Sequence, residues 1–281
     1  MNNFIISGFS DEIDENIDIQ FQTLKELGIQ YFEPRGINGK NIADLTDDEV
    51  MKLLAAMKKY GIRASSIGSP IGKIGIRENF EPHFEKFKRV IEIAKMLGTE
   101  YIRMFSFYIP EGQNPDLFRG EVTFRLVKMI TYAKSQNVVL LHENEKGIYG
   151  DTAKRCHDLF DALYSPNFKA VFDPANFIQC GEDTKNAYEI LSPYIAYMHI
   201  KDAKNDGSVV PAGHGNGNIE YILNKLAEND YFGFLSLEPH LGSFSGLENL
   251  ETDDKMLELE KSSKEKFELA YNSVKAIIER I

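Results

Sequence analysis

The stretch VVLLHENEK (Val138–Lys146) runs from four apolar residues directly into four polar or charged ones. An uninterrupted run of Val and Leu is typical of a strand that is buried on both faces, as in a parallel sheet covered by helices. Charged groups at the end of such a strand are costly to bury unless they have partners. We interpret His142, Glu143, Asn144 and Glu145 as one wall of a metal site.

The pattern of that stretch, an apolar run that ends in a polar or Gly-rich turn and leads into a helical segment, occurs eight times. Successive runs start about 30 residues apart, which is the length of a strand plus a crossover helix. We therefore predict an α/β fold, a single (β/α)8 TIM barrel. The predicted strands are FIISGF from Phe4, YFEPRG from Tyr31, RASSIGS from Arg63, YIRMFSF from Tyr101, VVLLHEN from Val138, KAVFDPAN from Lys169, AYMHIKD from Ala196 and GFLSLEPH from Gly233.

Strict alternation of strands and helices also fits an open doubly wound sheet. A dinucleotide-binding sheet of that kind has GxGxxG after its first strand, whereas the first predicted strand here leads into SGFSDEID. The sequence also has no GxxxxGKS/T loop. The eight repeats therefore favour the closed barrel, and neither phosphate-binding motif supports an open sheet.

Two helical segments carry clear start and stop signals. In LTDDEVMKLLAAMKKYGI (Leu45–Ile62), Thr46 and Glu49 have the spacing of a reciprocal cap, and Gly61 ends the helix. In FEKFKRVIEIAKMLG, apolar residues recur at helical spacing up to Gly98, where the absence of a Cβ favours a left-handed cap. The same spacing predicts a last helix within residues 255–281.

The composition limits the number of domains and the kinds of partner that the chain can have. With 281 residues, 43% of them apolar, the chain can form one large core, and we predict a single domain over residues 1–281. The 43 acidic and 32 basic residues give a formal charge of −11, which disfavours nucleic acid and anionic membrane surfaces as partners. No apolar run approaches the roughly 20 residues of a membrane span, and the N-terminus lacks a secretion signal. We expect a cytoplasmic protein whose two cysteines are reduced.

Polar residues end four of the predicted strands, at the edge where a TIM barrel places its active site. Glu143, Asp173, His199 and Glu238 come from four consecutive strands, so we expect their side chains to converge above the sheet. Each also has a simpler explanation: a core position for His199, a turn at Asp173, and solvated strand ends for the two glutamates. Because so many charged groups in one place are costly without a cation, we predict a divalent metal ion.

Five motifs resemble those of the xylose isomerase-like TIM barrels, grouped as sugar phosphate isomerases and epimerases. They are HEN (142–144), FDPAN (172–176), HIKD (199–202), PAGHGNG (211–217) and LEPH (237–240). The resemblance covers nearly the whole chain and implies one catalytic divalent ion held by Glu143, Asp173, His199 and Glu238. It also implies that Glu143 and Glu238 are the catalytic pair, which moves a proton on opposite faces of a sugar. Mn²⁺ is the ion expected first, and Co²⁺, Mg²⁺, Fe²⁺ and Zn²⁺ are compatible with the same ligands.

Six residues are candidates for contacts with a sugar substrate. They are Glu33, His142, Asn176, Lys201, His214 and His240. In the family that the chain resembles, the position of Asn176 is often His and that of His214 is often Glu. Structural alternatives are a turn at Glu33, an ion pair of Lys201 with Asp202, and a place for His142 in the helix layer.

The resemblance implies a metal-dependent isomerase or epimerase of a small sugar or keto-sugar, working by proton transfer through an enediolate. The alternative is a lyase or dehydratase that acts on a keto-sugar, keto-inositol or keto-glycoside, and a third hypothesis is a non-catalytic sugar-binding barrel. The expected partner is a small carbohydrate, and homo-oligomers are usual among relatives. Residues 241–281 are expected to form a lid-like loop, Leu241–Lys255, and a C-terminal helix.

Overall fold

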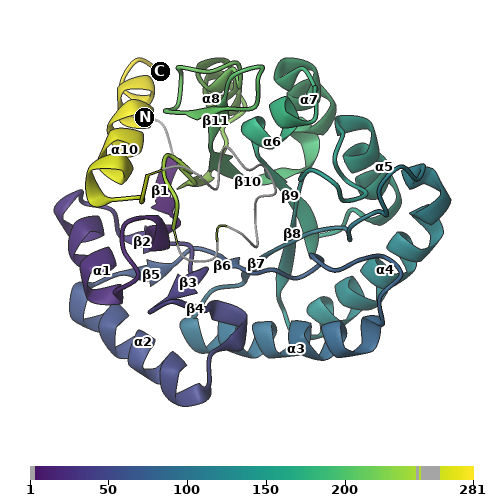
Figure 1. Cartoon of the computed structure of the whole chain (residues 1–281), viewed down its shortest axis with the longest axis horizontal. Helices are drawn as coiled ribbons and strands as arrows, with labels where there is room; N and C mark the ends of the chain where they lie inside the picture. Colours follow the sequence, from purple (N-terminus) through teal and green to yellow (C-terminus); the bar gives the residue numbers. More distant parts are fainter. Residues whose placement is uncertain (1–3, 245–246, 248–259) are drawn as a thin grey trace.

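Parallel strands form the inner wall of a barrel, and helices surround it (Figure 1). The computed structural model describes residues 4–244, 247 and 260–281. The strand pairings of the wall are all parallel, as the predicted α/β barrel requires. The wall consists of β1 (Phe4–Gly8), β2 (Tyr31–Phe32), β5 (Arg63–Ala64), β6 (Ile67–Gly68), β7 (Tyr101–Met104), β8 (Val139–Glu143), β9 (Phe168–Phe172), β10 (Ile195–Ile200) and β13 (Gly233–Leu237).

The barrel closes through its shortest strand. Seven strands follow one another in the order β1-β13-β10-β9-β8-β7-β6, and β2 pairs with β5. The Glu33 N–H donates to Gly8 O at 2.8 Å and the Gly68 N–H donates to Pro34 O at 2.9 Å, so the second strand bridges the gap between the first and the third. The predicted strand YFEPRG extended to residue 36, but the regular strand ends at Phe32, and Pro34 has no N–H with which to continue the ladder.

The helices cover the outside of the barrel in chain order (Figure 1). Short hairpins follow two of the strands at the same end: β3 (Gly36–Ile37) with β4 (Lys40–Asn41), and β11 (Asp202–Ala203) with β12 (Val209–Val210). A 3₁₀ turn, η1 (Ser10–Glu12), follows β1. The helices are α1 (Ile17–Glu26), α2 (Asp47–Tyr60), α3 (Phe80–Leu97), α4 (Arg119–Ser135), α5 (Ala153–Leu163), α6 (Pro174–Gln179), α7 (Thr184–Leu191), α8 (Ile219–Glu228) and α10 (Lys264–Ile278).

The predicted helix signals are confirmed. Thr46 Oγ1 accepts from the Glu49 N–H, and the Glu49 carboxylate accepts from the Thr46 N–H, which satisfies two donors at the start of α2. Gly61 and Gly98 end α2 and α3 with φ of 72° and 74°, in the left-handed region where a Cβ is unfavourable. The apolar residues of α3 are buried at the predicted positions, Phe84, Phe87, Val90, Ile91, Ala94 and Leu97.

The lower part of the barrel interior is apolar. Val139, Leu141, Val171 and Tyr197 are buried together there. Because side chains alternate along a strand, Leu141 and Tyr197 point to the same side of the wall as Glu143 and His199, two residues further on. The polar strand ends therefore lie on top of a packed apolar layer.

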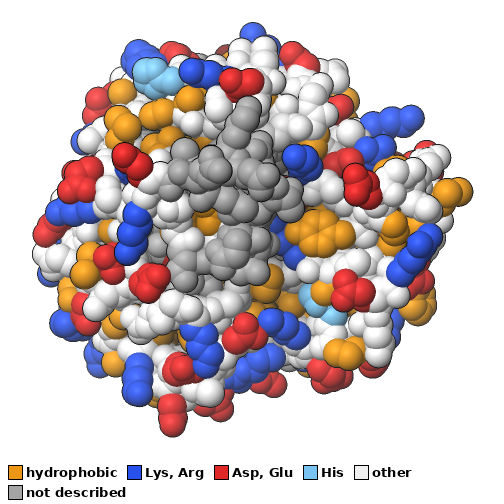
Figure 2. Space-filling model, viewed as in Figure 1, with side chains coloured by type: hydrophobic (Ala, Val, Ile, Leu, Met, Phe, Trp, Pro, Cys, Tyr) orange, Lys and Arg blue, Asp and Glu red, His pale blue; other side chains and the backbone are white. Residues whose placement is uncertain are grey.

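Acidic and basic side chains are interspersed over the face that Figure 2 shows. Across the described residues, none of the helices has the length and apolarity needed to cross a bilayer. Most of the predicted lid, Leu241–Lys255, lies outside the described residues, whereas the predicted C-terminal helix is α10.

Candidate metal centre

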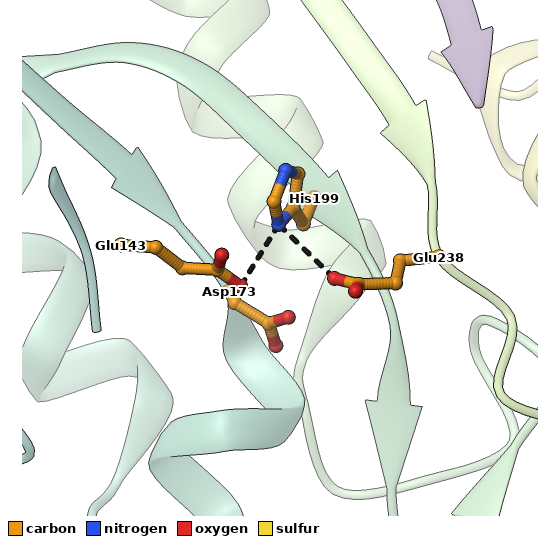
Figure 3. Close-up of side chains that lie close together, drawn as sticks. All are labelled: Glu143, Asp173, His199 and Glu238. Atoms are coloured by element: carbon orange, nitrogen blue, oxygen red, sulfur yellow. Dashed lines mark hydrogen bonds and ion pairs between the residues drawn. The ribbon is translucent and has the colours of Figure 1, made fainter. Parts of the chain in front are cut away.

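Four side chains from four neighbouring strands point toward one another at the C-terminal end of the barrel (Figure 3). Glu143 is the last residue of β8, Asp173 follows β9, His199 lies in β10 and Glu238 follows β13. Each residue offers one ligand atom, and these four atoms all lie within 4.8 Å of one another. The structure thus brings together the four residues that strand-end position singled out.

The two glutamates are arranged in the same way on either side of His199. His199 Nδ1 lies 3.0 Å from Glu143 Oε1 and 3.1 Å from Glu238 Oε2 (Figure 3). The other oxygen of each glutamate faces a guanidinium: Arg103 Nη1 is 3.1 Å from Glu143 Oε2, and Arg35 Nη1 is 2.9 Å from Glu238 Oε1. Both glutamates are buried, which excludes the alternative that they are solvated strand ends.

Asp173 combines a structural contact with a place in the cluster. Its Oδ1 accepts from the Asn176 N–H at 3.0 Å and so caps α6, while its Oδ2 lies 3.0 Å from Lys201 Nζ. The side chain of Asn144 donates to Asp173 O at 2.9 Å and accepts from the Asp173 N–H at 3.0 Å. These two bonds tie the end of β8 to the end of β9, and therefore Glu143 to Asp173.

The donor set fits a divalent cation. Asp173 Oδ2 and Glu238 Oε2 are buried and accept no well-aligned hydrogen bond, so each has a lone pair available for a ligand. Six buried carboxylates lie around the cluster with three permanent cations. Burial raises the pKa of Glu12 to about 8, and the carboxylates around His199 raise its pKa against the effect of burial, so both groups offset part of this imbalance. A divalent ion would offset it in place of the His199 proton. The carboxylates are Asp11, Glu12, Glu33, Glu143, Asp173 and Glu238, and the cations are Arg35, Arg103 and Lys201.

The electrostatics of the cluster keep two of its carboxylates ionised. Burial raises the pKa of Glu143, but the positive charges around it, His199 first, outweigh burial and hold that pKa at about 2. Burial likewise opposes ionisation of Glu238, and Lys201 and His199 overcome it, so the Glu238 pKa lies well below its ordinary value. Burial raises the pKa of Asp173 to about 7, because Lys201 offsets only part of it. Ionised carboxylates are the form that binds metal.

Three of the six candidate substrate contacts border the cluster. Asn176 Nδ2 lies 3.3 Å from Glu143 Oε1, and His240 Nε2 lies 3.4 Å from Glu238 Oε1. Lys201 pairs with Asp173, so the alternative in which it pairs with Asp202 is wrong. The Asp202 carboxylate instead accepts from the backbone N–H groups of the PAGHGNG loop, at Gly213, Gly215 and Gly217.

The structure does not bring the other three candidates into the same space. His142 packs its ring against Phe160 and Phe168, at centroid distances of 6.0 and 6.2 Å, which is the helix-layer alternative. His214 is exposed on the PAGHGNG loop. Glu33 is buried and faces Nε2 of His199 at 3.4 Å, whereas Glu143 and Glu238 face the other ring nitrogen.

Sequence reasoning missed the role of four charged residues. Arg35 and Arg103 contact the two glutamates, and Asp11 and Glu12 of η1 bind the Arg35 guanidinium from behind. Arg103 carried a usable signal, because it occupies an inward-facing position in the apolar strand YIRMFSF and can be buried there only beside a carboxylate. The Asp11 and Glu12 pair resembled an ordinary acidic loop.

Comparison with known proteins identifies the family. A family model described as Xylose isomerase-like TIM barrel matches residues 21–261. The chain belongs to that family. The predicted resemblance and the predicted fold class are thereby confirmed.

The individual proteins that the chain resembles are distant from it in sequence. A 3-dehydroshikimate dehydratase of Bacillus anthracis is 21% identical over 233 residues, which cover 76% of this chain and 83% of the relative. The structure of a D-allulose 3-epimerase from Methylomonas sp. in complex with D-allulose has a TM-score of 0.74 at 14% identity and covers 100% of this chain and 98% of the other. The structure of the IOLI protein with a bound zinc atom has a TM-score of 0.72 at 14% identity, with 98% of each chain covered. These likenesses establish the fold, and they include both epimerases and a dehydratase.

Proposed function

We propose that the chain is a divalent-metal-dependent isomerase or epimerase of a small sugar or keto-sugar. The observation that carries the proposal is the placement of Glu143 and Glu238, which face His199 Nδ1 at 3.0 and 3.1 Å. Two carboxylates on two sides of one point can remove a proton from one face of a substrate carbon and return it to the other face. Proton transfer next to a carbonyl by such a pair passes through an enediolate.

The residues around the pair limit how strongly each carboxylate acts as a base. Arg103 and Arg35 each bind one oxygen of a glutamate, which leaves Glu143 Oε1 and Glu238 Oε2 directed at the centre of the cluster. With their pKa values held low, these carboxylates are weak bases toward an unactivated carbon. A divalent ion held by Glu143, Asp173, His199 and Glu238 would polarise the substrate carbonyl and stabilise the negative charge that develops on its oxygen.

Three polar side chains at the border of the cluster are proposed to orient the substrate. Asn176 and Lys201 lie beside Glu143 and Asp173, and His240 lies beside Glu238. Burial lowers the pKa of His240 to about 4, with the charge of Lys201 acting in the same direction. His240 is therefore neutral at pH 7, where it suits a hydrogen bond to a sugar hydroxyl better than protonation of a leaving group.

A lyase or dehydratase is the second candidate, and the dehydratase relative of Bacillus anthracis is the observation that favours it. Both reactions begin with the same deprotonation. They differ in whether the enediolate regains a proton or expels a neighbouring oxygen, and expulsion requires an acid above the leaving group.

The proposal is tested by incubating a panel of keto-sugars in D₂O with the protein, which is first loaded with Mn²⁺ and then freed of excess metal. Proton NMR of the sugars follows the reaction. We expect deuterium at the carbon next to the carbonyl together with an isomeric sugar. An unsaturated product would instead assign the lyase. No exchange with any member of the panel would contradict both reactions for these substrates.

Matched variants connect that result to the cluster. Glu143→Gln and Glu238→Gln are each expected to slow the exchange by about 10²-fold or more, since each removes one partner of the proton-transfer pair. Glu121→Gln is the control: Glu121 lies on α4 and pairs with Arg125 at 2.7 Å, outside the cluster. Equal rates for all three variants would show that the chemistry lies elsewhere.

A further inference from the structure

Glu33 lies behind His199, on the side away from the metal-site glutamates. Glu33 Oε2 is 3.4 Å from His199 Nε2, a buried nitrogen that makes no well-aligned hydrogen bond, whereas Nδ1 of the same ring faces Glu143 and Glu238. Glu33 and His199 are 1% and 0% exposed, so no solvent competes for this contact. The arrangement places one carboxylate at one ring nitrogen and the candidate metal ligands at the other.

Hydrogen bonds fix the Glu33 carboxylate from below. Its Oε2 accepts from the Tyr197 hydroxyl at 2.9 Å, and that hydroxyl lies 2.8 Å from Ser65 Oγ. Ser65 Oγ is in turn 2.6 Å from Ser7 Oγ and donates to Phe32 O at 3.0 Å. This chain crosses the barrel interior from β10 to β1, so the position of Glu33 is set by three different parts of the wall.

The backbone of Glu33 is fixed as well. Its N–H donates to Gly8 O at 2.8 Å, in the contact that closes the barrel. Pro34 follows directly and restricts the backbone of Glu33 to extended conformations. The carboxylate therefore has little freedom to move away from His199.

We propose that Glu33 is a positioning residue that accepts the N–H of His199 Nε2 and so directs the lone pair of Nδ1 at the metal centre. A histidine that binds a metal usually donates its other N–H to a carboxylate, a carbonyl or water, and this contact sets both the tautomer and the ring orientation. The inference rests on the metal centre of the proposed function. This positioning role takes the place of the direct substrate contact expected of Glu33, because His199 lies between Glu33 and the rest of the cluster.

Zinc binding, measured by isothermal titration calorimetry, tests the inference. Glu33→Gln keeps the shape of the side chain and removes its charge, and we expect it to bind Zn²⁺ about 10- to 100-fold more weakly than the wild type. Tyr197→Phe is the matched control, because it removes the other partner of Glu33 Oε2 and leaves the carboxylate facing Nε2. We expect Tyr197→Phe to weaken Zn²⁺ binding less than Glu33→Gln does, because the carboxylate is retained and loses only one of its hydrogen bonds. Circular dichroism and thermal unfolding establish that each variant is folded.

The outcomes separate this inference from the proposed function. If the wild type binds neither Zn²⁺ nor Mn²⁺, the metal centre fails and the role of Glu33 fails with it. If the wild type binds but Glu33→Gln binds equally well, the role of Glu33 is overturned and the metal centre stands.

Nitrogen-15 NMR of the zinc-loaded wild type provides a second measurement that needs no folded variant at position 33. We expect the ring proton of His199 on Nε2 and the zinc on Nδ1. Zinc bound through Nε2 would overturn the inference. The signals of His199 are assigned by their loss in His199→Asn.

Discussion

Arg35 Nη1 donates to Glu238 Oε1 at 2.9 Å, deep inside the barrel. The same guanidinium donates to both oxygens of Asp11, at 2.8 and 3.1 Å, and to Glu12 Oε1 at 3.0 Å. It also lies over the rings of Phe9 and Phe244, each 4.4 Å from its central carbon. One buried cation thus links η1, the loop after β2 and the end of β13.

Replacing this cation is expected to destabilise the fold. Arg35→Met leaves three buried carboxylates without their shared partner, and removing one partner of a buried ion pair typically costs about 3 to 5 kcal/mol. Urea denaturation at pH 7 measures the loss. Arg280→Met is the control, because Arg280 pairs with Glu220 at 3.0 Å on the surface, where we expect little change. Equal midpoints for the two variants would contradict the buried network.

Gly72 is expected to tolerate no side chain. Its φ is +91°, and a Cβ there would lie 2.0 Å from the carbonyl oxygen of Phe105. Gly72→Ala should cost about 3 kcal/mol or more, because the backbone of Phe105 has to move. Gly61 also has a positive φ, of +72°, but has open space around it, so Gly61→Ala should cost only about 1 to 2 kcal/mol. Thermal unfolding compares the two, and similar losses would refute the steric argument.

His83 makes stability depend on pH. Burial, together with the charges of Lys86 and Arg125, lowers its pKa to about 4, and its Nε2 accepts from the Gly72 N–H at 2.8 Å. The unfolded chain therefore binds a proton at this histidine near pH 6.5, whereas the folded chain binds it only near pH 4. The contribution of His83 to the free energy of unfolding is therefore fully present above pH 6.5 and is lost as the pH falls toward 4.

His83→Gln removes that dependence and retains an acceptor for the Gly72 N–H. Between pH 7 and pH 4.5 the wild type should lose about 2 to 3 kcal/mol more of its free energy of unfolding than the variant. Urea denaturation at the two pH values gives the difference, in which the other titrating groups cancel. Parallel losses in the two proteins would show that His83 does not titrate in this range.

Asp202 is expected to hold the PAGHGNG loop against the barrel. Its carboxylate accepts from Gly213, Gly215 and Gly217, at 2.9, 3.0 and 2.8 Å. Asp202→Asn replaces one accepting oxygen by a donor, which should cost about 2 to 4 kcal/mol and increase proteolysis of the loop. Asp161→Asn is the control, because Asp161 is exposed on α5. Resistance of Asp202→Asn to protease at the wild-type level would argue against this role.

Strand order explains how much of the site could be predicted. Glu143, Asp173, His199 and Glu238 end consecutive strands, and a closed parallel barrel makes consecutive strands neighbours, so their convergence follows from the repeat alone. The N-terminal cap of α2 could be predicted equally well, because Thr46 and Glu49 lie only three residues apart in the sequence and contact each other.

The contacts that the sequence does not reveal join distant parts of the chain. Arg35 and Glu238 are 203 residues apart, and Glu33 meets His199 only because the barrel closes next to Gly8. Neither contact has a characteristic spacing, since each depends on how deep a side chain reaches into the interior. His142 was expected among the substrate contacts, and the structure instead has the helix-layer alternative that strand alternation indicated.

The side chain of Asn144 continues the hydrogen bonding between β8 and β9 past the end of the two strands. By bonding both the N–H and the C=O of Asp173, its side chain stands in for the backbone of a longer strand. Thermal breathing that displaces one strand tip therefore carries the other with it, and the spacing between Glu143 and Asp173 is preserved. The loops that follow these two strands can then diverge in length and sequence, or be exchanged by grafting, without disturbing the placement of the two carboxylates beneath them.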